Sequence, residues 1–174
     1  MSDNFYHQCD KSIFVKTQKG HGASPEKVAL IGKRSVVYSE GETADEIEFN
    51  FCSLKEITGQ DVINARGLFK DPINFYTQCK LNMLTNYVPP LDGQDAIKIR
   101  TRFLFFDSQF IANPKGPNQF RKDDDFVKKL TTEYLSEVFS WIAQGAYEYY
   151  QTKTIEMPPK EREDPIIFFE YNSS

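Results

Sequence analysis

Residues 30–42 read LIGKRSVVYSEGE, and this stretch decides how the surrounding chain should fold. Its central part, RSVVYSE at residues 34–40, is short and rich in β-branched residues, which predicts a buried strand. Three polar residues, Ser39, Glu40 and Glu42, stand at the end of the apolar run. Because α/β folds place their chemistry at the carboxyl ends of core strands, these side chains are candidates for a functional site. A solvated turn is the simpler alternative.

The Gly32-Lys33 pair in front of this strand looks like the end of a phosphate-binding loop, Gly-x-x-x-x-Gly-Lys-Ser/Thr. In such a loop the glycines let backbone N–H groups surround the phosphates, and the hydroxyl binds magnesium. Here Lys27 stands in place of the first glycine and Arg34 in place of the hydroxyl residue. A phosphate loop also follows a strand and opens a helix, whereas this segment opens a strand. The match is therefore accidental.

Upstream of the strand, Ser24-Pro25-Glu26 has the composition of a helix start. Serine caps helices, proline suits the first helical position, and glutamate complements the positive end of the helix dipole. This predicts a short helix that ends near Gly32. Residues 1–23 are polar and irregular, and we expect one short strand within them, at residues 13–16.

Downstream of the strand, residues 43–58 predict a helix, because Ile47, Phe51, Leu54 and Ile57 recur at helical spacing. Alternating residues in 61–78, on either side of GLFKDP, predict a β-hairpin. Residues 80–86 and 101–107 predict two further strands. Residues 123–152 predict one long amphipathic helix, whose buried side is marked by Phe126, Leu130, Tyr134, Leu135, Val138, Trp141 and Ile142.

This order of elements predicts the fold class. Strands that alternate with helices, followed by a hairpin, are typical of an α/β core rather than an all-α or all-β fold. With 174 residues, the chain is long enough for one domain with a hydrophobic core. We expect an irregular segment at residues 1–23, the domain at residues 24–152, and a tail at residues 153–174.

The composition excludes several classes of protein and of site. A formal net charge of -4 argues against a basic nucleic-acid coat, and no apolar run approaches the ~20 residues of a membrane span. The three cysteines, Cys9, Cys52 and Cys79, form no Cys-x-x-Cys pair, and the histidines are His7 and His21. We therefore expect no zinc site, no disulfide framework and no Cys–His catalysis. We expect an intracellular setting, where cysteines stay reduced.

Four segments, in this order, resemble the superfamily 3 helicase domain of primase–helicases from poxviruses, other large nucleocytoplasmic DNA viruses, phages and plasmids. They are GKRSVVYSEGE (32–42), SLKEITGQDVINARGLFKDPINF (53–75), CKLNMLTNYVPPLDG (79–93) and IKIRTRFLFFDSQF (97–110). The resemblance covers about residues 12–150. It implies a partial AAA+-like core of the phosphate-loop NTPase class, from the Walker B strand onward. It also implies a pore-type β-hairpin and a long C-terminal helix.

The resemblance implies roles for individual residues in a site for ATP and Mg²⁺. Glu40 would polarise the attacking water and bind the metal, with Ser39 beside the metal. Asn86 would contact the terminal phosphate as sensor 1. Arg100 or Arg102 would act as an arginine finger in a neighbouring subunit's site, because a guanidinium matches phosphate geometry and stays charged. The ordinary alternatives are a turn role for Asn86 and surface charges on one face of a strand for the two arginines.

By the same resemblance, the hairpin would line the central pore of a hexamer. Lys70, with Arg66 and Phe69, would bind a DNA strand there, because the tip places cations beside an aromatic ring. Two alternatives stay open. The first is that Arg66 forms an ion pair with Asp61 or with an acid of a helix. The second is that Lys70 only makes the hairpin tip more soluble.

One element of the family is absent, since no phosphate loop occurs between Met1 and Ile31. Ile99 also stands where the first of a pair of arginines is expected. Loss of the whole phosphate loop should abolish tight nucleotide binding, because loss of one hydrogen-bond donor to the transition state already costs roughly 10²–10³ in rate. We expect a fragment of a viral primase–helicase that unwinds DNA in the host cytoplasm only with a partner polypeptide carrying the phosphate loop and the primase part. The alternative is a non-catalytic module that binds DNA or a helicase hexamer.

Overall fold

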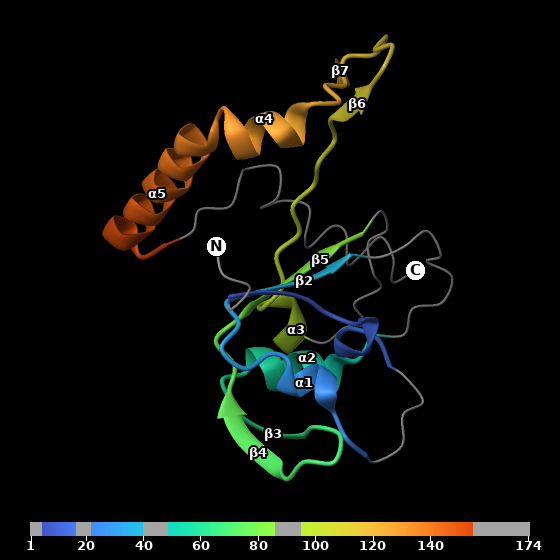
Figure 1. Cartoon of the computed structure of the whole chain (residues 1–174), viewed down its shortest axis with the longest axis vertical. Coiled ribbons are helices and arrows are strands. Elements are labelled where there is room, and N and C mark those ends of the chain that lie inside the picture. The colour runs from blue at the N-terminus through green and yellow to red at the C-terminus, as the bar shows by residue number, and fades with distance from the viewer. Residues whose placement is uncertain (1–4, 17–21, 40–48, 86–94, 155–174) are drawn as a thin grey trace. The chain divides into compact units, whose positions relative to one another are not determined.

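The structure, a computed structural model, describes residues 5–16, 22–39, 49–85 and 95–154. These residues divide into two compact units, with the boundary between Arg102 and Phe103. Unit 1, before the boundary, mixes helices with a parallel sheet and a hairpin, and unit 2, after it, holds a short sheet and two helices (Figure 1). The α/β class predicted from the sequence is confirmed for unit 1. None of the helices in the described ranges combines the length and hydrophobicity needed to cross a bilayer.

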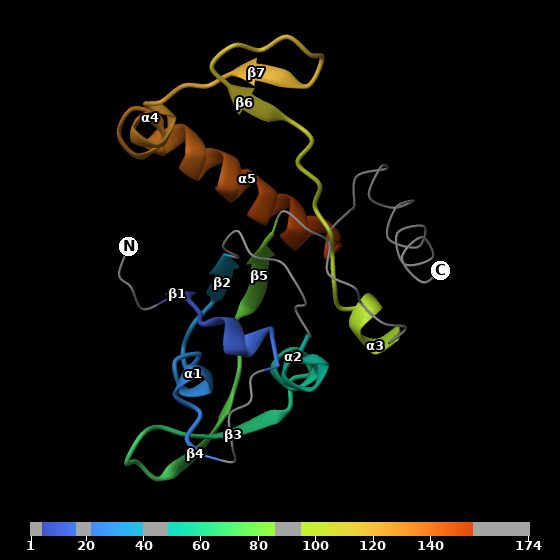
Figure 2. The ribbon, with the colours of Figure 1, turned by 90° about the vertical axis from the view of Figure 1, so that its right-hand side faces the viewer.

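A three-stranded parallel sheet forms the centre of unit 1, in the order β1-β2-β5 (Figure 2). Its strands are β1 (Tyr6–Gln8), β2 (Ser35–Ser39) and β5 (Lys80–Leu84). Val36 of β2 is fully buried, and it lies between His7 on one side and Leu81 on the other. The strands predicted at residues 34–40 and 80–86 are confirmed, because β-branched and apolar residues suit a strand with neighbours on both sides.

The N-terminal segment differs from the prediction. Lys11–Ile13 form a short 3₁₀ helix, capped by Asp10, whose carboxylate accepts a hydrogen bond from the Ser12 N–H at 2.8 Å. Val15 makes only a single antiparallel bridge, to Phe49, so the strand predicted at residues 13–16 is wrong. The actual strand, β1, was missed because its three residues are mostly polar and carry no apolar alternation.

Two helices of unit 1 begin where side chains or proline favour a helix start. Helix α1 (Pro25–Val28) starts with Pro25 as predicted. Helix α2 (Phe51–Thr58) begins after Asn50, whose amide oxygen accepts a hydrogen bond from the Ser53 N–H at 3.0 Å. The predicted start at residue 43 is too early, because residues 49 and 50 are not helical; residues 43–48, with Ile47, lie outside the described ranges.

The predicted hairpin is confirmed and consists of β3 (Val62–Arg66) and β4 (Pro72–Tyr76), joined by a tip at Gly67–Asp71. Alternate residues of β3, Ile63 and Ala65, are buried on the inner face. Helices α1 and α2 both lie against β3, so the hairpin closes one side of the core of unit 1. That core combines segments far apart in the sequence: Cys9, Ile13, Phe14, Leu30, Val36, Phe49, Ile57, Ile63 and Ala65.

The strand predicted at residues 101–107 is wrong. A single-turn helix, α3 (Asp95–Lys98), packs through Ile97 beside α2, and residues 101–108 then run without a strand assignment. The rings of Phe103 and Phe105 still lie on one side, 6.3 Å apart, as in an extended segment. In the described part of the chain no strand lies beside this segment, and without a ladder the alternating pattern does not make a strand.

Unit 2 contains β6 (Gln109–Ile111), β7 (Gln119–Arg121), α4 (Phe126–Thr132) and α5 (Leu135–Thr152). The predicted single helix at residues 123–152 is therefore two helices, separated at Glu133–Tyr134. Its predicted buried side is also wrong, since no described residue of unit 2 is buried. Trp141, for example, is 78% exposed. The amphipathic pattern is present, but none of the described segments of unit 2, residues 103–154, buries it.

Candidate functional site

The first candidate site is the edge of the sheet where β2 and β5 end. The two strands are parallel neighbours, and Ser39, the last residue of β2, pairs with Leu84, the last residue of β5. Parallel strands that end together direct the following residues to the same edge of the sheet. Glu40 directly follows Ser39, and Asn86 follows Thr85, but both lie outside the described residues. Their roles stay predictions.

Ser39 is the described member of the predicted metal site. It is exposed at the end of β2, and a hydroxyl oxygen is a ligand type that suits Mg²⁺. Among the residues that the structure describes, no group of three or more His, Cys, Asp and Glu side chains could hold a metal. Magnesium carried by a nucleotide takes most of its ligands from phosphates and water. The role of Ser39 as a metal ligand stays a prediction.

The two predicted arginine-finger candidates are not on a strand. Arg100 follows α3, and its Nη1 donates to the carbonyl oxygen of Lys55 in α2 at 3.4 Å. It thus binds a carbonyl in the last turn of α2, where a cation also complements the helix dipole. Nη1 of Arg102 donates to the backbone oxygens of Ile99 and Thr101. Arg100 has a structural partner in α2, whereas the hydrogen bonds of the Arg102 side chain to described residues lie within its own loop.

The second candidate site is the tip of the hairpin. Phe69 is fully exposed and has a φ of +56°, a left-handed conformation that is strained for an aromatic residue. Leu68 beside it is 65% exposed, and Arg66 and Lys70 are exposed on either side. Within the described ranges, Arg66 forms no ion pair with Asp61 or with an acid of α2. An uncovered aromatic ring between two cations is an arrangement that suits a nucleic-acid strand.

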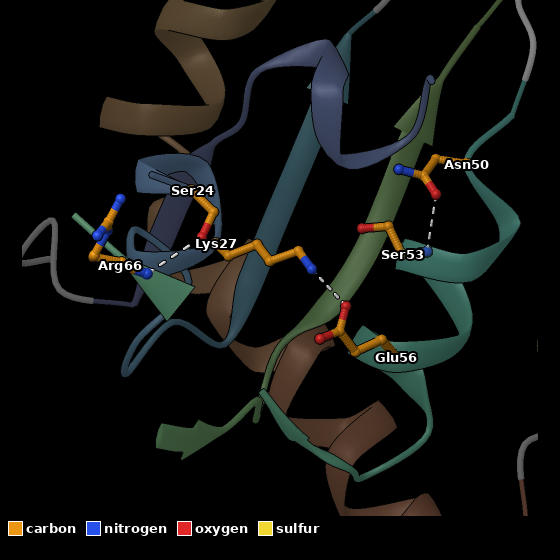
Figure 3. Close-up of polar contacts among 6 residues, drawn as sticks. All are labelled: Ser24, Lys27, Asn50, Ser53, Glu56 and Arg66. Carbon is orange, nitrogen blue, oxygen red and sulfur yellow. Dashed lines mark hydrogen bonds and ion pairs between the residues drawn. The ribbon is translucent and has the colours of Figure 1, made fainter. Parts of the chain in front are cut away.

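A hydrogen-bonded pair of residues holds the hairpin beside α1 (Figure 3). The Ser24 N–H donates to the Arg66 carbonyl oxygen at 2.7 Å, and the Arg66 N–H donates to the Ser24 hydroxyl at 3.3 Å. Ser24 occupies the N-cap position as predicted, yet its side chain does not cap α1, because it binds the hairpin instead. This contact fixes β3 just before the tip.

An ion pair and a second hydrogen bond complete this support. Lys27 of α1 pairs with Glu56 of α2 at 2.5 Å, so the two helices that carry β3 are linked (Figure 3). At the other end of the hairpin, the Thr77 hydroxyl donates to the Ile57 carbonyl oxygen at 2.6 Å. Sequence reasoning missed these contacts, because the partners lie 20 to 42 positions apart and no local pattern marks the pairing.

Cys9 and Cys79 are not arranged for nucleophilic chemistry. Burial raises the pKa of the Cys9 thiol to about 11, and burial also raises the pKa of Cys79. Cys9 and Cys79 therefore remain protonated at neutral pH, whereas a reactive cysteine needs a lowered pKa. Burial lowers the pKa of His7, which lies on β1, and the positive charge of nearby Lys33 lowers it further.

Comparison with known proteins finds a relative with a helicase name. Over 109 residues the chain is 33% identical to a protein of Acanthamoeba polyphaga mimivirus named "Putative helicase". The match includes 62% of this chain but 11% of the mimivirus protein, so the chain spans about a tenth of the length of that curated relative. No protein-family model matches the chain. The chain is thus similar to one segment of a much longer viral protein.

Proposed function

We propose that the chain is part of a viral DNA helicase of superfamily 3, of the primase–helicase type. The observation that carries the proposal is the pairing of β2 and β5, which end together with Ser39 opposite Leu84. An acid, Glu40, and an amide, Asn86, follow these two strand ends in the sequence. The identity of 33% to a segment of the mimivirus protein supports a helicase relationship.

In this proposal, ATP and Mg²⁺ bind at the carboxyl edge of the sheet. Glu40 orients the attacking water, Asn86 contacts the terminal phosphate, and the Ser39 hydroxyl binds the metal. The 174 residues contain no Gly-x-x-x-x-Gly-Lys-Ser/Thr, so the phosphate cradle comes from another part of the assembly. Arg102 is the better candidate for an arginine finger in a neighbouring subunit, because Arg100 is engaged with α2.

The hairpin is the proposed DNA contact. Phe69 would stack on a base, while Arg66 and Lys70 would neutralise backbone phosphates. The hydrogen bonds to Ser24 and the Lys27–Glu56 pair support this role, because they hold the hairpin in place while its tip stays exposed.

Binding of single-stranded DNA tests the role of the hairpin. Phe69→Ala should weaken binding of a fluorescent oligothymidine about tenfold, because a lost stacking contact costs roughly 1–3 kcal/mol. Lys70→Ala should weaken binding less. It should also reduce the slope of log affinity against log salt by about 1, which corresponds to one lost phosphate contact. Lys128→Ala, which removes an exposed lysine of α4, is the matched control. Unchanged binding by both hairpin variants would remove the pore assignment.

ATP hydrolysis tests the site at the sheet edge. The chain alone should not hydrolyse ATP, whereas adding a polypeptide that carries the phosphate loop Gly-x-x-x-x-Gly-Lys-Ser/Thr of the family should restore hydrolysis. Glu40→Gln should then reduce the rate by about 10² or more, because it removes the group that activates water. Glu137→Gln, which changes an exposed acid of α5, is the control. Hydrolysis by the chain alone that disappears with Glu40→Gln would contradict the dependence on a partner.

A non-catalytic module is the second candidate function, and the contact between Arg100 and Lys55 favours it, because a capping arginine need not act on phosphate. Such a module would bind DNA or a helicase assembly through the hairpin. One result would support this candidate over the first. The chain, mixed with the polypeptide that carries the phosphate loop, would bind DNA, and Phe69→Ala would weaken that binding as expected, but the mixture would never hydrolyse ATP.

A further inference from the structure

The outer face of the hairpin is an exposed surface that continues from the tip to the base of β3 and β4. These strands lie on the far side of α1 and α2 from the central sheet (Figures 1 and 2). Ile63 and Ala65 are buried, so the residues that alternate with them, and their partners on β4, form the outer face. Its members, all exposed, are Val62, Asn64 and Arg66 of β3 and, opposite them, Tyr76, Asn74 and Pro72 of β4.

An exposed aromatic ring lies at each end of this surface. Tyr76, at the base, is 63% exposed and stands opposite Val62, whereas Phe69 lies at the tip. Four residue steps separate the Val62–Tyr76 pair from the Arg66–Pro72 pair. At the usual rise of ~3.3 Å per residue, this distance is about 13 Å. A nucleic-acid strand stacked as in duplex DNA advances about 3.4 Å per nucleotide, so the two rings are placed to stack on different bases of one strand.

Two hydrogen-bonded amides lie between the rings. Nδ2 of Asn64 donates to Oδ1 of Asn74 at 2.7 Å across the two strands. This bond uses one donor and one acceptor, so Asn64 keeps its oxygen and one N–H for other partners, and Asn74 keeps both of its N–H donors. Side-chain amides bind phosphate oxygens and base edges. Because the bond between them already fixes the two side chains, binding would cost little of their conformational freedom.

The charge of the outer face suits a polyanion. Arg66 is its charged member, and the two acids of the hairpin region, Asp61 and Asp71, lie outside the paired residues of β3 and β4. A cation, amides and a ring without a carboxylate among them do not repel phosphates. A protein that covered this face would have to satisfy the amides and the guanidinium one by one, whereas a nucleic-acid strand carries acceptors along its whole length.

We propose, in an inference that rests on the function proposed above, that the outer face of the hairpin extends the DNA site and that Tyr76 stacks on a base. The DNA strand runs from Phe69 at the tip, past Arg66 and the Asn64–Asn74 pair, to Tyr76 at the base. Every base has a π-face, so the second ring adds affinity without requiring a particular sequence. The hairpin thus binds several consecutive nucleotides through its length and not one nucleotide through its tip.

Binding of a fluorescent oligothymidine to the full chain tests the role of Tyr76. Tyr76→Ala and Tyr76→Leu should each weaken binding about tenfold, because both remove the ring, whereas Tyr76→Phe should bind within about twofold of the wild type. Leucine keeps an apolar contact with Val62, so this variant separates a lost stacking contact from a less stable hairpin. Tyr147→Ala, which removes a tyrosine of α5 that is 60% exposed, is the matched control and should bind as the wild type does.

Photocrosslinking gives an independent readout of the same contact. An oligothymidine in which iodouracil replaces thymine should crosslink to the rings on which its bases stack. Mass spectrometry should then find the crosslink on the peptide that contains Tyr76 as well as on the peptide that contains Phe69. In Phe69→Ala the crosslink to Tyr76 should become weaker but persist, because a different base contacts each ring. A crosslink confined to the tip peptide would contradict the extended site.

The other outcomes separate this inference from the function on which it rests. If Phe69→Ala weakens binding but the Tyr76 variants do not, the DNA site ends at the tip, and the proposed function stands without the extension. If neither position matters, both are wrong. Wild-type binding by Tyr76→Leu would mean that the ring packs against Val62 and does not stack on a base. Self-association of the chain that Tyr76→Ala abolishes, with DNA binding unchanged, would assign the outer face to a second copy instead.

Discussion

Helices α2 and α5 have similar amphipathic patterns, but only α2 has its apolar side covered. In unit 1, Ile57 of α2 is 2% exposed, because the hairpin and neighbouring segments pack against it. In unit 2, Ile142 of α5 is 58% exposed, and only α4 contacts α5 appreciably among the described elements of that unit. The difference shows that periodicity predicts a helix and its apolar face, whereas burial depends on what other segments supply.

The largest expected effect separates the two units by stability. Ile63→Ala should lower the free energy of unfolding of unit 1 by about 2–5 kcal/mol, because it opens a cavity at a fully buried position. Ile142→Ala should change it by about 0.5 kcal/mol or less, because that side chain lies outside the core. Hydrogen exchange of peptides from β2 and β3, measured in dilute protein, checks both. Equal losses would show that α5 contributes to the core of unit 1.

A smaller effect concerns the ion pairs of the two units. In unit 1, the Lys27–Glu56 pair is half-buried, and a double-mutant cycle with Lys27→Met and Glu56→Gln should give a coupling of about 0.5–1 kcal/mol. In unit 2, the Lys129–Asp123 pair is more exposed, and its coupling should be smaller and should vanish in high salt. A larger coupling in unit 2 would contradict the view that it is a solvated surface.

The smallest effect is a difference in pH dependence. Burial and Lys33 lower the pKa of His7 from its ordinary 6.5, so the folded state of unit 1 favours the neutral imidazole. Unit 1 should therefore lose stability as the pH falls below that ordinary value, because the unfolded chain then binds more protons. In unit 2, the hydrogen bond from Lys129 lowers the pKa of Asp123 from its ordinary 3.8. The contribution of Asp123 to the stability of unit 2 is therefore lost only in stronger acid, as the pH falls below that ordinary value.

Urea unfolding at pH 7 and pH 5 checks this difference. Unit 1, followed by hydrogen exchange in β1 and β2, should be less stable at pH 5, and His7→Asn should remove most of that loss. Unit 2, followed by the fluorescence of Trp141, should change little between the two pH values. An unchanged pH dependence in His7→Asn would show that another group is responsible.

Elements with a local signal were predictable from the sequence. The apolar run of β2, the Pro25 helix start and the alternation around the hairpin tip each depend on residues close together in the chain, and all three are confirmed. β1 was missed because Tyr6–Gln8 is short and polar, and it becomes a strand only by pairing with β2. The strand predicted at residues 101–107 failed for the opposite reason, since its alternation has no neighbouring strand.

The candidate site divides in the same way. The sequence pointed to the strand end at Ser39 and to the exposed tip with Phe69 and Lys70, because short patterns mark both. It did not indicate that Arg66 binds Ser24, because these residues are 42 positions apart. It also did not indicate that Arg100 binds α2. Contacts of this kind depend on how the backbone brings distant residues together.

The sequence by itself determined the α/β class of unit 1, the β2 strand, the hairpin and the amphipathic character of α5, because local sterics and side-chain periodicity set them. Only the tertiary structure decided that β2 lies between β1 and β5, that Ser24 and the Lys27–Glu56 pair support the hairpin, and that the large apolar side chains of α5 are exposed among the described residues. Burial and strand pairing are properties of segments that meet in space, and no single stretch of sequence contains both partners.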